Sequence, residues 1–95
     1  MSIIVQKFGG TSVANPERIK AIAEKIAKFS SQGNQIVVVV SAMSGETNKL
    51  ISLAEEMMSS PEPREMDIIV STGEQVTSGL TALALINLGI KAKSY

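Results

Sequence analysis

The apolar residues of this chain follow two spacings, one typical of strands and one typical of helices. Residues 3–5 are three consecutive apolar residues with Gly9-Gly10 close behind, a pattern that predicts a short buried strand ending in a glycine turn. Residues 36–40 are five consecutive branched apolar residues without polar alternation. This run predicts a strand buried on both faces, as in a parallel sheet covered by helices.

Helical spacing marks three further segments. The first is expected to begin at Asn15-Pro16, an N-cap followed by a proline at the first helical position, and to close at Gly33. The second includes residues 50–57, and the third runs from residue 64 to residue 88.

Residues 90–95 alternate between apolar and polar, like the beginning of another strand. The order of elements is then strand, helix, strand, helix, helix, strand, which is typical of an α/β fold with a mostly parallel sheet. With 95 residues, the chain is long enough for one small domain at most.

Charge, apolar runs and cysteine content exclude several kinds of binding partner. Nine basic and nine acidic residues cancel, so the chain lacks the positive surface that nucleic acids and anionic membranes require. No apolar run approaches the ~20 residues of a membrane span or forms a signal-peptide core. The absence of cysteine removes disulfides and thiolate metal sites. We therefore expect a cytoplasmic protein with no nucleic-acid or membrane partner and no metal-binding residues of its own.

Candidate chemistry lies where the strands end, because an open α/β sheet binds ligands beyond the carboxyl ends of its strands. The first strand leads into Lys7-Phe8-Gly9-Gly10-Thr11-Ser12. The glycines would let backbone N–H groups approach an anion, and the lysine and hydroxyls would complete the cradle. The alternative is an ordinary glycine turn with a solvated lysine, which Gly-Gly alone favours.

Two further segments carry candidate ligand groups. The segment after the valine-rich strand contains Ser41, Ser44 and Thr47, whose hydroxyls suit a phosphate or carboxylate. Alternatively, Ser44 or Thr47 caps the helix that follows. In the third helix, Glu74 lies beside Gly73 at the edge of the apolar face, where it could meet an ammonium group or be an ordinary surface glutamate.

Taken in order, these segments resemble aspartate kinases. Residues 5–13 resemble the family's N-terminal signature position for position. Ser41-Ala42-Met43, followed by Thr47-Asn48, resembles the family's second block. Ser71-Thr72-Gly73-Glu74 resembles the third. The resemblance covers the whole chain.

The resemblance implies the amino-acid-kinase fold, a three-layer αβα sandwich with a mostly parallel sheet. Residues 1–95 would be the N-terminal portion of the catalytic domain, without the remaining catalytic half and the regulatory ACT domains. The implied reaction transfers the γ-phosphate of ATP to the side-chain carboxylate of L-aspartate, the first step of lysine, threonine and methionine biosynthesis. Mg²⁺ would be bound mainly through the nucleotide. Alone, the chain is expected to be inactive and to associate with itself or with the missing part of the enzyme.

The resemblance also implies residue roles, with Lys7 as the catalytic residue. The implied contacts to ATP and its phosphates are Lys7, Phe8, Gly9, Gly10, Thr11 and Ser12. The implied contacts to aspartate are Ser41, Thr47 and Glu74. No general base is required, because an aspartate side chain with a pKa of ~3.9 is already ionised at neutral pH. A chain without histidine or cysteine therefore remains compatible with this reaction.

Two alternatives stay open. The chain could belong to another amino-acid kinase, such as an acetylglutamate kinase, although Thr11-Ser12 and Thr47 argue against that group. It could also be a non-catalytic assembly module in which the glycine turn and Glu74 are structural.

Overall fold

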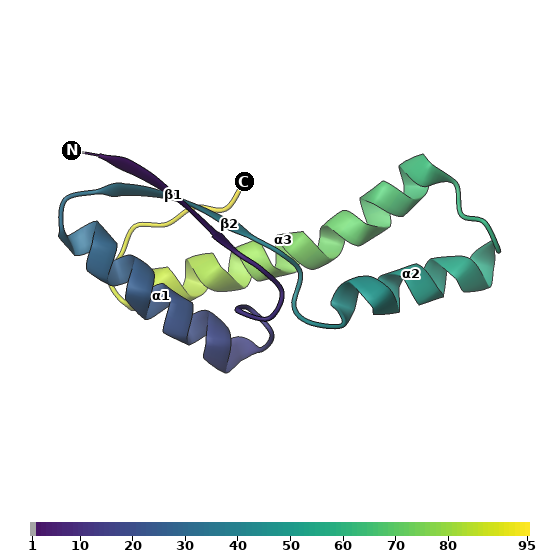
Figure 1. Cartoon of the computed structure of the whole chain (residues 1–95), viewed down its shortest axis with the longest axis horizontal. Coiled ribbons are helices and arrows are strands. Elements are labelled where there is room, and N and C mark those ends of the chain that lie inside the picture. The colour runs from purple at the N-terminus through teal and green to yellow at the C-terminus, as the bar shows by residue number, and fades with distance from the viewer. Residues whose placement is uncertain (1) are drawn as a thin grey trace.

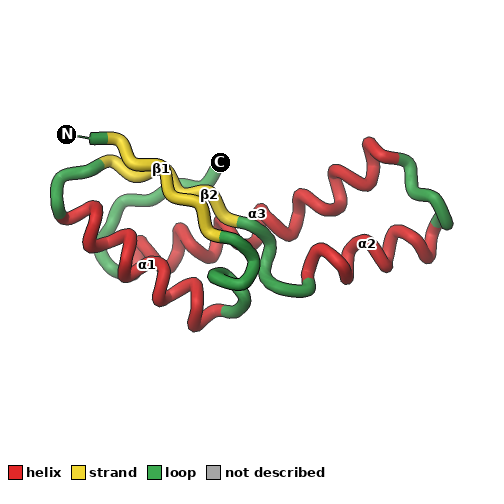
Figure 2. Tube along the Cα trace, viewed as in Figure 1, coloured by secondary structure: helices red, strands yellow, loops and turns green. Residues whose placement is uncertain are grey.

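Within residues 2–95, which the computed structural model describes, two parallel strands and three helices make up the fold (Figures 1 and 2). The elements are β1 (Ile3–Phe8), α1 (Pro16–Ser31), β2 (Gln35–Val40), α2 (Glu46–Met57) and α3 (Pro63–Asn87). The strands pair from Ile3 opposite Gln35 to Phe8 opposite Val40, and α1 is the crossover that a parallel pair requires. The α/β layout predicted from the sequence is confirmed.

The molecule is elongated, with extents of 50 × 24 × 17 Å. Figure 1 shows why: α2 and the first half of α3 form a helical hairpin that projects away from the sheet, while the second half of α3 lies beside α1. Within residues 2–95, no helix combines the length and the apolar character needed to cross a bilayer.

The start of α1 is as predicted. Asn15 is the N-cap, and its Oδ1 accepts a hydrogen bond from the backbone N–H of Arg18 at 2.9 Å. Pro16 occupies the first helical position. After the last helical residue, Gly33 adopts a φ of 86°, which side chains other than hydrogen disfavour. Both ends of α1 are therefore determined by local backbone chemistry.

Replacing Asn15 with alanine should lower the free energy of unfolding by about 1 kcal/mol, because the N–H of Arg18 loses its acceptor. Urea denaturation followed by far-ultraviolet circular dichroism, at matched protein concentrations, measures this effect. Asn15→Asp is the control, since aspartate caps helices as well as asparagine does. Equal midpoints for the alanine and aspartate variants would show that the cap contributes nothing.

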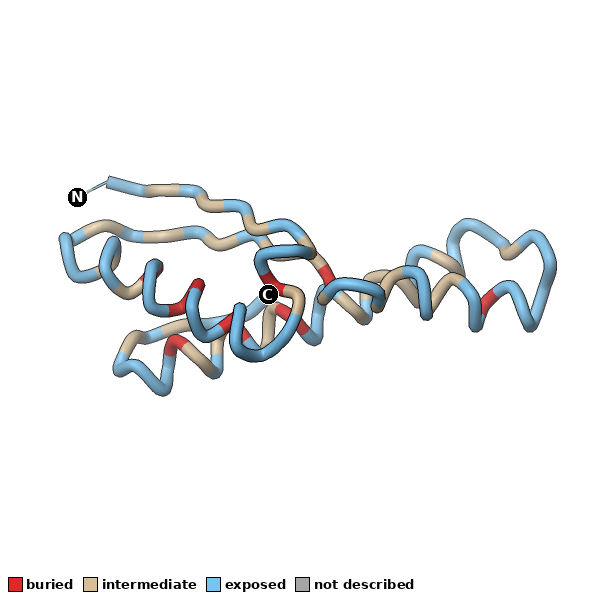
Figure 3. Tube along the Cα trace, turned by 60° about the horizontal axis from the view of Figure 1, so that its bottom comes forward, coloured by how far each residue is buried: buried red, intermediate tan, exposed pale blue. Residues whose placement is uncertain are grey.

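The core lies under one face of the sheet (Figure 3). Along each strand, half-buried residues alternate with exposed ones. The half-buried side chains pack against residues of α1, α3 and the turn before α1. The buried residues of this core are Val13, Ile19, Ile22, Ala23, Ile26 and Leu85.

The opposite face of the sheet is open. Ile3, Val5, Val37 and Val39 are between 45% and 69% exposed there. The prediction that residues 36–40 are buried on both faces is therefore wrong for this chain. The reason is that α1 and α3 both lie on the same side of the sheet, so one layer of helices covers one face only (Figure 1).

The strand expected at residues 90–95 does not form. Ile90 and Ala92 pack against the core while Lys91 and Lys93 are exposed, so the predicted alternation is present. A strand also needs a ladder of hydrogen bonds to a neighbour, however, and this segment is in no sheet. A hollow of about 600 Å³ is lined by residues of both this segment and β2. The alternation alone could not reveal whether a partner strand lies within reach.

Candidate active site

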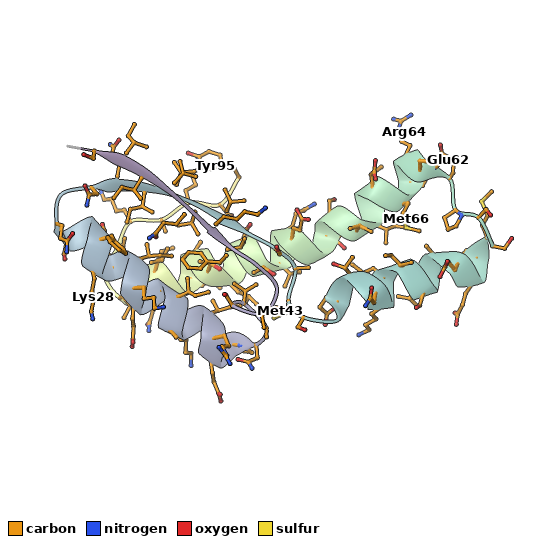
Figure 4. All side chains as sticks on the ribbon, viewed as in Figure 1. Lys28, Met43, Glu62, Arg64, Met66 and Tyr95 are labelled. Atoms are coloured by element: carbon orange, nitrogen blue, oxygen red, sulfur yellow. The ribbon has the colours of Figure 1, made fainter. Side chains whose placement is uncertain are left out.

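The three segments singled out in the sequence meet around Ala42, which is only 5% exposed. A Cβ atom placed on Gly10 would lie 3.4 Å from the carbonyl oxygen of Ala42. A Cβ atom placed on Gly73 would lie 3.0 Å from the Cβ of Ala42. The turn after β1 and the middle of α3 therefore both approach the segment that follows β2. Figure 4 labels Met43, the neighbour of Ala42, in this junction between the sheet and α2.

The turn after β1 closes on itself and leaves backbone donors unused. The N–H groups of Ser12 and Val13 donate to the carbonyl oxygen of Gly9 at 3.0 and 3.2 Å. Val13 is fully buried and anchors the end of the turn. Within residues 2–95, the N–H groups of Gly10 and Thr11 make no hydrogen bond. Such unpaired donors beside a glycine turn are suited to an anion.

Lys7 lies on the open side of the sheet, and Ser41 lies just beyond the end of β2. Lys7 is exposed, and its register partner is Val39. Ser41 is half-buried, and its N–H donates to the carbonyl oxygen of Phe8 at 3.2 Å. This bond holds the backbone of Ser41 beside the residue that follows Lys7.

Phe8 has a different role from its neighbours. Its side chain is half-buried and packs against the core on the covered face. Its carbonyl oxygen is held by the N–H of Ser41. Any contact of Phe8 with a phosphate would therefore come from the backbone, whereas Thr11 and Ser12 have exposed side chains at the loop surface.

The start of α2 differs from the capped helix expected there. Gly45 is the N-cap with a φ of 84°, and no side chain caps the helix. The alternative in which Ser44 or Thr47 caps this helix is therefore wrong, because Gly45 is the N-cap and no side chain accepts from the first turn. Thr47 is half-buried in the first turn of α2. The first N–H groups of this helix are left without a side-chain acceptor.

Glu74 is exposed on α3, directly after Gly73. The two hydroxyls before it are used within the helix: Ser71 donates to Ile68 at 2.8 Å and Thr72 donates to Ile69 at 2.7 Å. Glu74 thus directly follows the glycine of α3 that lies against Ala42.

The structure joins the backbones of the three segments but shows no direct contact between Lys7 and Glu74. The hollow beside β2 contains none of the candidate residues, so cavity volume does not identify this site. Within the described residues, no group of three or more histidine, aspartate or glutamate side chains is placed to hold a metal ion. Ala42 and Gly73 were missed as functional candidates, although both belong to the sequence blocks that drew attention to their neighbours.

Known proteins similar to this chain are amino acid kinases. Residues 2–95 match the model of the amino acid kinase family. The chain is 61% identical over its whole length to the aspartokinase of Pseudomonas aeruginosa and 45% identical to that of Mycobacterium tuberculosis, in each case covering 23% of the relative.

Two solved structures resemble the chain. An aspartate kinase from Synechocystis is 51% identical, with a TM-score of 0.88 over 90% of this chain and 15% of that one. E. coli aspartokinase III, solved with aspartate and ADP, has a TM-score of 0.81 at 23% identity over 96% of this chain and 30% of that one, a likeness of fold alone. The chain spans about a quarter of the length of the curated relatives it matches. By the match of its whole described length, the chain belongs to the amino acid kinase family.

Proposed function

We propose that these residues are the N-terminal portion of the catalytic domain of an aspartate kinase, which transfers the γ-phosphate of ATP to the side-chain carboxylate of L-aspartate. The observation that carries the proposal is the convergence of the three segments around Ala42. The identity of 61% to an aspartokinase and the likeness to an aspartate kinase structure support it. The remaining catalytic half and regulatory domains would lie outside these residues, and we expect the enzyme to be cytoplasmic.

In this proposal, the phosphate side of the site is built from the turn after β1. The N–H groups of Gly10 and Thr11 are unpaired within residues 2–95, and Lys7 adds a positive charge at the end of β1. Backbone donors and a lysine suit the phosphates of ATP, which also bring any Mg²⁺ to the site. Gly9, Ser12 and the backbone of Phe8 would complete this surface.

The aspartate side of the site is assigned to Ser41, Thr47 and Glu74. The uncapped start of α2 offers N–H groups to a carboxylate or phosphate, with Thr47 in its first turn. The carboxylate of Glu74 would bind the α-ammonium group. The chemistry then consists of positioning, because the nucleophile is an ionised carboxylate and needs no proton removed.

An ADP-release assay of the full-length kinase that contains this chain tests the proposal. Aspartate-dependent release of ADP is expected, with little or no release when N-acetylglutamate replaces aspartate. Preference for N-acetylglutamate would favour an acetylglutamate kinase instead. Absence of turnover with both substrates in a folded enzyme would favour a non-catalytic assembly module.

The 95-residue chain by itself is expected to show no turnover and to self-associate. Positioning two substrates in line needs a complete nucleotide site, and this chain covers 23% of the matching kinases. The open face of the sheet and the exposed apolar residues of α3, such as Val76 and Leu83, favour association because apolar surface leaves water on contact.

Light scattering and the same ADP-release assay on the purified chain check both statements. A monomer that unfolds cooperatively would contradict the expected association. Aspartate-dependent turnover by the chain alone would contradict the need for the rest of the enzyme.

A further inference from the structure

At Gly73, α3 lies against the segment that follows β2. A Cβ atom there would lie 3.0 Å from the Cβ of Ala42 and 3.5 Å from Cδ1 of Leu50. Carbon atoms in favourable contact are about 3.5–4.0 Å apart, so a methyl group on Gly73 would push α3 and Ala42 apart by a few tenths of an ångström. The helix can hold its present position because residue 73 has no side chain.

No other property of Gly73 explains a glycine at this position. Its φ is not positive, in contrast to Gly33, Gly45 and Gly89. In a helix interior, glycine is less stabilising than alanine because it loses more backbone freedom on folding. Gly79 provides a comparison in the same helix, since a Cβ atom there would meet no atom within 4 Å.

Ala42 lies between the two halves of the proposed site. On one side its Cβ touches the surface of Gly73, next to Glu74, and on the other its carbonyl oxygen lies against Gly10. The separation between the phosphate-binding turn and the ammonium-binding carboxylate is thus determined by contacts through one small residue.

We propose that Gly73 is a positioning residue that holds Glu74 at the correct distance from the turn after β1, through its direct contact with Ala42. This inference rests on the proposed aspartate kinase function. A kinase with a separated α3 would still bind ATP through the turn, and it would bind aspartate more weakly, because Glu74 would lie farther from Ser41. The two substrates would then no longer be held in line, so the chemical step would be slowed more than binding would be weakened.

Gly73→Ala in the full-length kinase is expected to lower kcat by roughly tenfold, because the contact must open by a few tenths of an ångström and a misplacement near 1 Å can cost about 100-fold. The KM for aspartate should rise by a smaller factor than kcat falls, since Ser41, Thr47 and Glu74 are all intact and only their separation changes. Steady-state kinetics with aspartate varied at saturating ATP measure both constants.

The double variant A42G/G73A is the decisive test, because it removes the methyl group that the new side chain would meet. Its kcat should return to within about threefold of the value for Ala42→Gly alone, as expected for two residues in direct contact. The expected kcat of the double variant can be measured even if Gly73→Ala by itself does not fold. Gly79→Ala is the matched control, the same substitution in the same helix, and should leave kcat unchanged.

Three kinetic results would overturn the inference: an unchanged kcat for Gly73→Ala, a double variant as slow as Gly73→Ala, or an effect on the KM for aspartate alone. If the wild-type kinase shows no turnover of aspartate, the proposed function fails. The contact between Gly73 and Ala42 is then tested by the unfolding temperatures of the variants. A lower unfolding temperature for Gly73→Ala that Ala42→Gly restores would support the contact with Ala42, and parallel unfolding of all variants would refute it.

Discussion

Replacing Lys7 with alanine in the full-length kinase is expected to lower kcat by roughly 10²- to 10³-fold, with little change in the KM for aspartate. Lys7 stands at the carboxyl end of β1, directly before the turn whose N–H groups at Gly10 and Thr11 are unpaired within residues 2–95. Its charge would bear on the transferring phosphoryl group, where an interaction stronger in the transition state than in the ground state raises kcat.

Two variants make this result specific to Lys7. Lys28→Ala removes an equally exposed lysine from α1, which Figure 4 shows on the outer surface of that helix, and should leave kcat unchanged. Lys7→Arg keeps the charge but alters its shape, so it should retain more activity than alanine does. If the KM for aspartate rises while kcat is unchanged, Lys7 contacts aspartate and not the transferring phosphoryl group.

Glu74→Gln should weaken aspartate binding by roughly 10- to 100-fold, while kcat at saturating aspartate changes little. Glutamine preserves the shape of the side chain but removes the negative charge opposite the ammonium group, and hydrogen bonds to charged groups contribute about 1.5–3 kcal/mol. Titration of the full-length kinase with aspartate, by calorimetry, measures the affinity directly.

Glu55→Gln is the matched control, since it removes the same negative charge at an exposed position of α2 in the helical hairpin. Its aspartate affinity should equal that of the wild type. Unchanged affinity for Glu74→Gln would return Glu74 to an ordinary surface glutamate. Glu74→Gln is expected to act mainly on aspartate binding, whereas Gly73→Ala is expected to act mainly on kcat. Variants at these two neighbouring positions would thus distinguish a binding residue from a positioning residue.

The elements whose ends depend on local chemistry could be predicted from the amino-acid sequence. Asn15-Pro16 identified the start of α1 because a side-chain acceptor and a fixed φ act within one turn. The branched apolar run identified β2, and its neighbour β1 followed from the apolar residues before Gly9-Gly10. The candidate site segments were also visible, because the residue types that bind phosphates and ammonium groups follow the strands or interrupt an apolar face.

Which of these segments touch, and which faces of the sheet are covered, depends on how the elements pack together and could not be predicted from the sequence. An apolar run cannot show whether helices lie on one side of β2 or on both, since the same residues suit either arrangement until the other elements are placed. Residues 90–95 alternate like a strand yet have no partner strand, because pairing depends on what lies beside them. The contact between Ala42 and Gly73 joins residues far apart in the chain. The reason for a glycine at position 73 became apparent only from the short distance between a Cβ atom placed there and the Cβ of Ala42.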